Sequence, residues 1–314
     1  MGKTGEKSEA EQTKQEMKQE QKSRTLQELN LLDGFLFYEL AGSREYGETF
    51  CRIILERILG RPLKKIRVSV EKTLLGMEPE QHGIRIDAEV MEEDGDIYDL
   101  EPNLYEMDDP ARRSRYYHSL ITTRNFEKGE EYRDLREVYV IFILPYDPFG
   151  LGRMVYTMKS GCKEVPELPY EDGQYTIFLY TKGKDESGQS LADLLQYMED
   201  SREENATDEV LRILSRMVET VKRDREVGAK YMRMELHDLD VKNAARKEAL
   251  EEGRQEGRIE GRKAGMRAAA AICRKVGLSE EAAAEQLREE YPELGDQALE
   301  YVKKCWENQE RQCD

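Results

Sequence analysis

The sequence predicts a mixed α/β fold, with a mixed sheet, followed by a helical C-terminal region. Segments between residues 66 and 144 show the alternating or continuous apolar runs that are typical of strands, and helical spacing precedes and interrupts them. From Leu191 to about Ala244 the apolar residues recur at helical spacing. The chain of 314 residues is long enough for one core of about 150–200 residues plus appendages.

The composition excludes several classes of protein. Charged residues make up 37% of the chain and the formal net charge is −17, which opposes non-specific nucleic-acid binding but leaves room for a local basic groove. The five cysteines form no CxxC pair, which indicates free thiols in a reducing compartment. Without a long apolar run or a signal peptide, we expect a soluble cytoplasmic protein with no membrane partner. Scattered histidines and the lack of a GxxxxGK[ST] loop argue against a zinc site and nucleotide hydrolysis.

The N-terminal elements can be assigned in order. Residues 1–24 are rich in Lys, Glu and Gln and are expected to form a disordered charged tail. The predicted core covers residues 25–185. Its first elements are an apolar cluster, a helix that Gly60 ends, and a strand, over residues 29–40, 47–60 and 66–76.

Two adjacent strand-like segments, residues 83–92 and 96–103, carry the most informative pair of side chains. Asp94-Gly95 between them is a favourable hairpin turn, which predicts antiparallel neighbours. Asp87 on one strand and Glu101 on the other could then meet at one point. Buried carboxylates repel each other unless they share a proton or bind a cation, and oxygen ligands suit Mg²⁺ or Mn²⁺. The backbone carbonyl of Pro102 is a candidate third ligand.

The second half of the core begins with a helix. Asp109 and Pro110 are the expected N-cap and first residue of a helix over residues 109–126. The continuous apolar run at residues 138–144 predicts a strand buried on both faces. Two further stretches, residues 147–159 and 175–183, are expected to extend the sheet.

The predicted helix over residues 109–126 is the most basic stretch of an acidic chain. Between residues 110 and 129 there are five basic residues and one acidic residue, Glu127. Each side chain alone is more typical of a solvated face, a salt bridge or the core than of a binding site. Taken together they predict a nucleic-acid-binding surface formed by Arg112, Arg113, Arg115, Tyr116, Arg124 and Lys128.

The C-terminal part divides into three predicted regions: a helical extension (186–245), a Glu-Gly-Arg repeat (246–266) and a small helical unit (267–310). Glycine costs a helix about 1 kcal/mol per site relative to alanine, so a repeat of glycines at a spacing of four needs a reason. Close helix–helix contact and a solvated, flexible linker are both open. A helical scaffold that forms homo-oligomers through residues 246–307 is one alternative function.

The ordered set of motifs resembles a known family. The segments GIRIDAEV, YDLEPN, RRSRYYHSLI, GEEYRDL, VYVIFI and DPFG follow one another as in the PD-(D/E)xK nuclease family transposases, also called recombination-promoting nucleases. The resemblance covers roughly residues 26–265. It implies a restriction-endonuclease-like αβββαβ core with added strands.

The resemblance also implies an activity and a site. The activity is a bacterial, metal-dependent DNA endonuclease linked to mobile elements and recombination, with Mg²⁺ or Mn²⁺ as the cofactor and DNA as the partner; RNA cleavage shares the same chemistry. Asp87 and Glu101 take the places of the two acidic ligands, and Glu48 on the first helix is the candidate for an assisting carboxylate.

One residue departs from the family pattern. Asn103 stands where the third motif usually carries Lys or Gln, and it is neither a cation nor a base. Arg113 or Arg115 from the next helix could fill that role. The alternative is a protein that has lost catalytic activity and acts as a nucleic-acid-binding or regulatory protein. Pro102 also lacks a backbone donor, so the strand must end there or lie at an edge.

Overall fold

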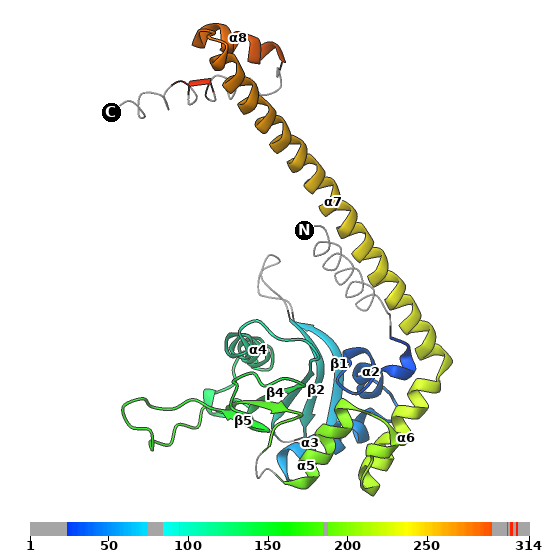
Figure 1. Ribbon diagram of the computed structural model, residues 1–314. Helices are drawn as coiled ribbons and strands as arrows, with labels where there is room; N and C mark the ends of the chain where they lie inside the picture. Colours follow the sequence, from blue (N-terminus) through cyan, green and yellow to red (C-terminus); the bar gives the residue numbers. More distant parts are fainter. Residues whose placement is uncertain are drawn as a thin grey trace. The chain divides into compact units, whose positions relative to one another are not determined.

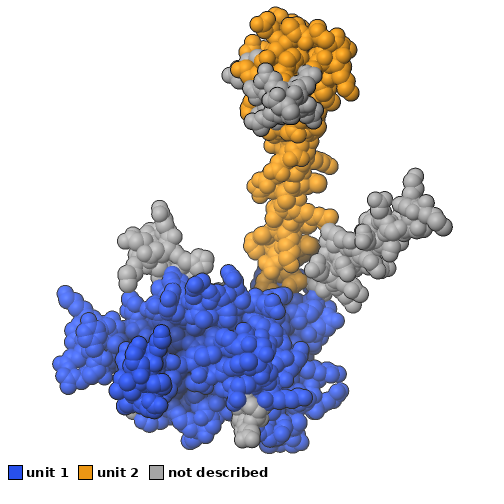
Figure 2. All heavy atoms as spheres, turned by 60° about the vertical axis from the view of Figure 1, so that its left-hand side comes forward, with its two compact units in different colours: residues 1–233 blue, residues 234–314 orange. Residues whose placement is uncertain are grey.

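The computed structural model describes residues 24–74, 84–93, 95–184, 188–290, 300, 302, 303 and 306. They form a mixed α/β structure with a six-stranded mixed sheet and a helical C-terminal region (Figure 1). Contacts divide the chain into two compact units, residues 1–233 and 234–314 (Figure 2). Residues 1–23 of the expected tail and Asp94 of the expected turn lie outside the described residues.

The sheet has the strand order β1-β2-β3-β4-β6-β5. β1, β2 and β3 are antiparallel neighbours, β3, β4 and β6 run parallel, and β5 is antiparallel to β6. The antiparallel pairing predicted for the two carboxylate-bearing strands is therefore confirmed. The strands are β1 (Ile66–Leu74), β2 (Ile84–Glu92), β3 (Ile97–Pro102), β4 (Val138–Leu144), β5 (Val155–Met158) and β6 (Gln174–Tyr180).

Two strand predictions have different outcomes. β4 is buried along nearly its whole length between β3 and β6, as its apolar run predicts. The strand predicted over residues 147–159 is wrong in its first half, because β5 begins at Val155. Asp147 accepts hydrogen bonds from the N–H of Phe149 and the hydroxyl of Tyr156, and these bonds hold the preceding segment as a turn.

One layer of helices packs on one face of the sheet, over β1 and β2. α2 (Gly34–Ala41) and α3 (Gly47–Leu59) contact β1, and α3 ends at Gly60 in the left-handed conformation, with φ +65°. α5 (Gln189–Glu199) and α6 (Glu209–Arg223) pack on α3. Arg57 of α3 donates two hydrogen bonds to Asp208, 2.6 and 2.7 Å long. α5, α6 and the sheet belong to the same compact unit, residues 1–233.

The helix α4 (Pro110–Arg124) lies on the other side of the sheet (Figure 1). Its start follows the prediction: the side chain of Asp109 accepts a hydrogen bond from the N–H of Arg112, and Pro110 is the first helical residue. Tyr117 and Ile121 face the sheet, where they join a core cluster with residues of β3, β4 and β6. This packing fixes which turn of α4 faces β3.

The second compact unit contains most of α7 (Arg225–Lys275), together with α8 (Glu280–Glu290). The Glu-Gly-Arg repeat lies within α7 and is helical throughout. A Cβ added at Gly253, Gly257 or Gly261 would meet nothing within 4 Å, so the described chain makes no close contact along this stripe. Among the described residues, no helix has the length and apolar character needed to cross a membrane.

Candidate active site

Four carboxylates lie on one face of the hairpin formed by β2 and β3. Asp87 and Glu89 alternate along β2, as Asp99 and Glu101 do along β3, so each strand turns both acids to the same side. Glu89 stands opposite Asp99 in the antiparallel register, which places Asp87 and Glu101 on the next rung. The face is the one that α4 covers, because Tyr117 of α4 contacts Glu101.

The predicted pair, Asp87 and Glu101, is brought together. The backbone N–H of Asp87 donates to Oε1 of Glu101 over 3.1 Å. The hydroxyl of Tyr117 donates to Oε2 of Glu101 over 3.3 Å. Glu101 is 5% exposed, so both of its oxygens are held inside the protein.

Sequence reasoning missed the second pair, Glu89 and Asp99. Both side chains are fully buried. Neither oxygen of Asp99 has a hydrogen-bond partner among the described residues. The available signal was the period-two alternation of acids, Asp-x-Glu on each strand, which places all four on one face once the hairpin pairs.

Burial and nearby negative charge favour the protonated forms of two of these acids, Asp99 and Glu101. Burial, followed by the charge of Glu101, raises the pKa of Asp99 well above its ordinary range. Burial, followed by the charge of Asp87, raises the pKa of Glu101 to about 8. Carboxylates in this condition need shared protons or a cation to compensate their charge.

A line of hydrogen bonds leads from Glu101 to the surface of α4. Nη2 of Arg113 donates to the hydroxyl of Tyr117 over 2.9 Å, and its guanidinium carbon lies 5.4 Å from the centre of the tyrosine ring. Burial lowers the pKa of Arg113, but the nearby Tyr117 and Glu101 outweigh that effect and raise it overall. Arg113 therefore remains a cation beside the carboxylates.

The other basic candidates occupy different surroundings. Arg112 is largely exposed and pairs with Asp109 at 2.9 Å. Tyr116 packs partly against the core cluster of β3, β4 and β6. The remaining three predicted residues, Arg115, Arg124 and Lys128, are exposed. Of the five predicted cations, Arg113 is the one whose hydrogen bonds lead to Glu101.

Asn103 is engaged in local structure. Its N–H donates to the carbonyl of Ile143 over 3.0 Å, and its Oδ1 accepts from the N–H of Tyr105 over 3.0 Å. The side-chain oxygen thus stabilises a turn just after β3, which ends at Pro102 as predicted.

Glu48, the candidate for an assisting carboxylate, is not brought to the cluster. It lies on α3, in the helical layer on the other side of the sheet from α4 (Figure 1). It pairs with Arg52 at 3.0 Å, and its side chain is 60% exposed.

The carboxylates of β2 and β3 are the kind of ligand that a hard divalent cation prefers, but their oxygens do not point to one common position. Asp87, Glu89, Asp99 and Glu101 supply oxygen ligands of the kind that Mg²⁺ and Mn²⁺ prefer, and the unpartnered oxygens of Asp99 are available. Among the described residues, however, no three His, Cys, Asp or Glu side chains converge as a metal-binding group. Binding of a cation therefore requires some of these carboxylates to rotate.

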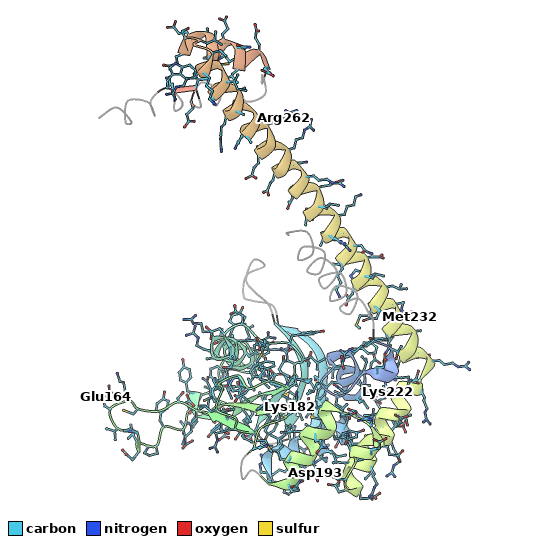
Figure 3. All side chains as sticks on the ribbon, viewed as in Figure 1. Glu164, Lys182, Asp193, Lys222, Met232 and Arg262 are labelled. Atoms are coloured by element: carbon cyan, nitrogen blue, oxygen red, sulfur yellow. The ribbon has the colours of Figure 1, made fainter. Side chains whose placement is uncertain are left out.

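Two lysines outside α4, Lys182 and Lys222, have partners other than the carboxylate cluster. Figure 3 labels Lys182, which follows β6, and Lys222, which belongs to α6. Lys182 pairs with Glu199 at 2.9 Å, and Nζ of Lys222 donates to the carbonyl of Gln27 over 3.1 Å. Burial lowers the pKa of Lys222.

Comparisons with family models, curated proteins and solved structures found no match for this chain. A function is therefore argued from the chemistry of the carboxylate cluster and the side chains around it.

Proposed function

We propose that this protein is a metal-dependent endonuclease that hydrolyses phosphodiester bonds of DNA. The observation that carries the proposal is the hydrogen bond from the N–H of Asp87 to the buried carboxylate of Glu101 on the adjacent strand, where the pKa of Glu101 is raised to about 8. The order α3-β1-β2-β3-α4-β4 supports a restriction-endonuclease-like core, as the resemblance to the recombination-promoting nucleases implies.

The reaction assigns a task to each group of residues. Asp87, Glu101 and the carbonyl of Pro102 would hold Mg²⁺ or Mn²⁺, which when bound polarises the scissile phosphate and a water. The water oxygen forms a bond to phosphorus, and the bond from phosphorus to the leaving sugar oxygen breaks with its electron pair. The water loses one proton to solvent, and the leaving oxygen takes one from solvent. The exposed cations of α4 and the following loop hold the DNA backbone.

The metal requirement tests the proposal directly. We expect the wild-type protein to nick or linearise supercoiled plasmid in Mg²⁺ or Mn²⁺, and to stop when a chelator is added, because the carboxylates alone cannot polarise the phosphate. The measurement is the rate of loss of the supercoiled band at matched protein concentrations. Cleavage that continues in excess chelator would contradict the proposal.

The basic surface gives a second expected result, on DNA binding. Replacing Arg112, Arg115 and Lys128 together by Gln should weaken binding and reduce the slope of log K against log salt by about 1 for each lost phosphate contact. Fluorescence anisotropy over a salt series measures both quantities. The matched control replaces three exposed arginines of α6, Arg212, Arg216 and Arg223, and should leave the slope unchanged.

Two observations favour a second candidate function, a lapsed protein that binds nucleic acid without cutting it. The side-chain oxygen of Asn103 accepts a hydrogen bond that stabilises a turn. The described carboxylates also do not form a group of three that could hold a metal ion. On this alternative the wild-type protein binds DNA with the salt dependence described above but cuts none in any divalent metal. The plasmid and anisotropy measurements together separate the two functions.

A further inference from the structure

Hydrolysis at this cluster creates an electrostatic problem. Four acids occupy one face of β2 and β3, and the negative charge of a scissile phosphate grows as its transition state forms. Fixed cations aimed at that charge are the usual protein contribution to phosphoryl transfer. A positive side chain must therefore stand within reach of Glu101.

Among the described cations of α4, Arg113 is the one that hydrogen bonds link to Glu101. Arg112 is held by Asp109 at the exposed start of α4. Lys182 and Lys222, labelled in Figure 3, have partners other than the carboxylate cluster. Asn103 carries no charge. Arg113 is linked to the cluster through Tyr117, which bonds to both Arg113 and Glu101.

The geometry leaves Arg113 able to bind a second group. One amino group of the guanidinium is anchored on the Tyr117 hydroxyl, while the residue as a whole is exposed. A guanidinium has five N–H donors in a rigid fork, which matches the oxygens of a phosphate. Tyr117 is 3% exposed and packs against Phe142 at 5.9 Å between ring centres, so it is a fixed support.

We propose that Arg113 is a catalytic residue that contacts the scissile phosphate, and that Tyr117 is its positioning residue. The Tyr117 hydroxyl bonds to both Arg113 and Glu101, so it holds the guanidinium near the carboxylates. This assignment rests on the proposed nuclease function. In the reaction written above, Arg113 neither gains nor loses a proton; it offsets the charge that builds on the phosphate oxygens while the bond to the leaving oxygen breaks. It fills the need that a neutral Asn103 leaves open.

The test separates turnover from binding. We expect Arg113→Gln to lower kcat by about 100-fold or more, as for loss of one transition-state donor, while KM changes less than about threefold. Anisotropy in Ca²⁺, without turnover, should show DNA affinity within the same threefold.

Arg113→Lys should recover part of kcat, and Tyr117→Phe should lower kcat about tenfold, because the arginine loses its anchor. Arg216→Gln, an exposed arginine of α6, is the matched control and should match the wild type.

Each outcome decides the assignment. If the wild type cuts and Arg113→Gln cuts at the same rate, the nuclease function stands and the role of Arg113 is overturned. The role is also overturned if Arg113→Gln loses DNA affinity in Ca²⁺ in proportion to its loss of rate, since that is simple backbone binding. A wild type that cuts nothing removes both the nuclease function and this role. Thermal unfolding of each variant shows whether it is folded.

Discussion

Asp87→Asn and Glu101→Gln are each expected to lower the rate of plasmid cleavage by about 1,000-fold or more, because each removes a charged oxygen ligand from the site that would hold the metal. Both replacements keep the size and shape of the side chain. The hydrogen bond from the N–H of Asp87 to residue 101 can be retained in either variant, since a glutamine oxygen also accepts. The loss should therefore appear in turnover and not in folding.

The matched control for these two variants is Glu93→Gln. Glu93 follows β2, is exposed, and pairs with Lys65 at 3.3 Å on the surface. The control should cut at the wild-type rate. Wild-type cleavage by either Asp87→Asn or Glu101→Gln would place the chemistry elsewhere in the chain, or in a contaminant.

The second large effect concerns stability in the metal-free protein. The pKa of Glu101 is about 8 in the folded chain and about 4.5 as the ordinary value. Between these two values the folded state binds more protons than the unfolded state, so the free energy of unfolding falls as pH rises and the loss is complete above pH 8. Each pKa unit corresponds to about 1.4 kcal/mol, so the total contribution is a few kcal/mol.

Glu101→Gln removes this dependence because glutamine does not titrate. Urea unfolding in chelator at pH 5, 7 and 9 should therefore show a variant whose stability relative to the wild type rises across the series. Asp99→Asn should act in the same direction, since burial and Glu101 raise the pKa of Asp99. Glu93→Gln should track the wild type. A wild type that gains stability relative to Glu101→Gln from pH 5 to pH 9 would contradict the assigned direction.

Local patterns explain why much of the fold could be predicted. The alternation in β2 and β3 and the short link between them determine an antiparallel pair, and no distant residue is needed to specify it. Asp109 and Pro110 mark the start of α4 in the same local way. The pair of Asp87 and Glu101 was predictable for this reason, since both residues belong to one hairpin.

The remaining parts of the site depend on how α4 packs on the sheet, which local patterns do not specify. Asp99 is fully buried on the face of β3 against which α4 packs, and the local strand pattern does not state which face a helix will cover. Helical spacing around Arg113 and Arg115 is compatible with either one facing the cluster, and the contact of Tyr117 with the sheet selects Arg113. Glu48 lies on a real helix, but a helix pattern does not state which side of the sheet it will cover.

The carboxylates, Tyr117 and Arg113 all come from one continuous stretch, residues 87–117. Closing short loops costs little chain entropy, and contacts between near neighbours in sequence form quickly. The hairpin and the first turns of α4 can therefore meet without waiting for β6, α5 or α6 to be added.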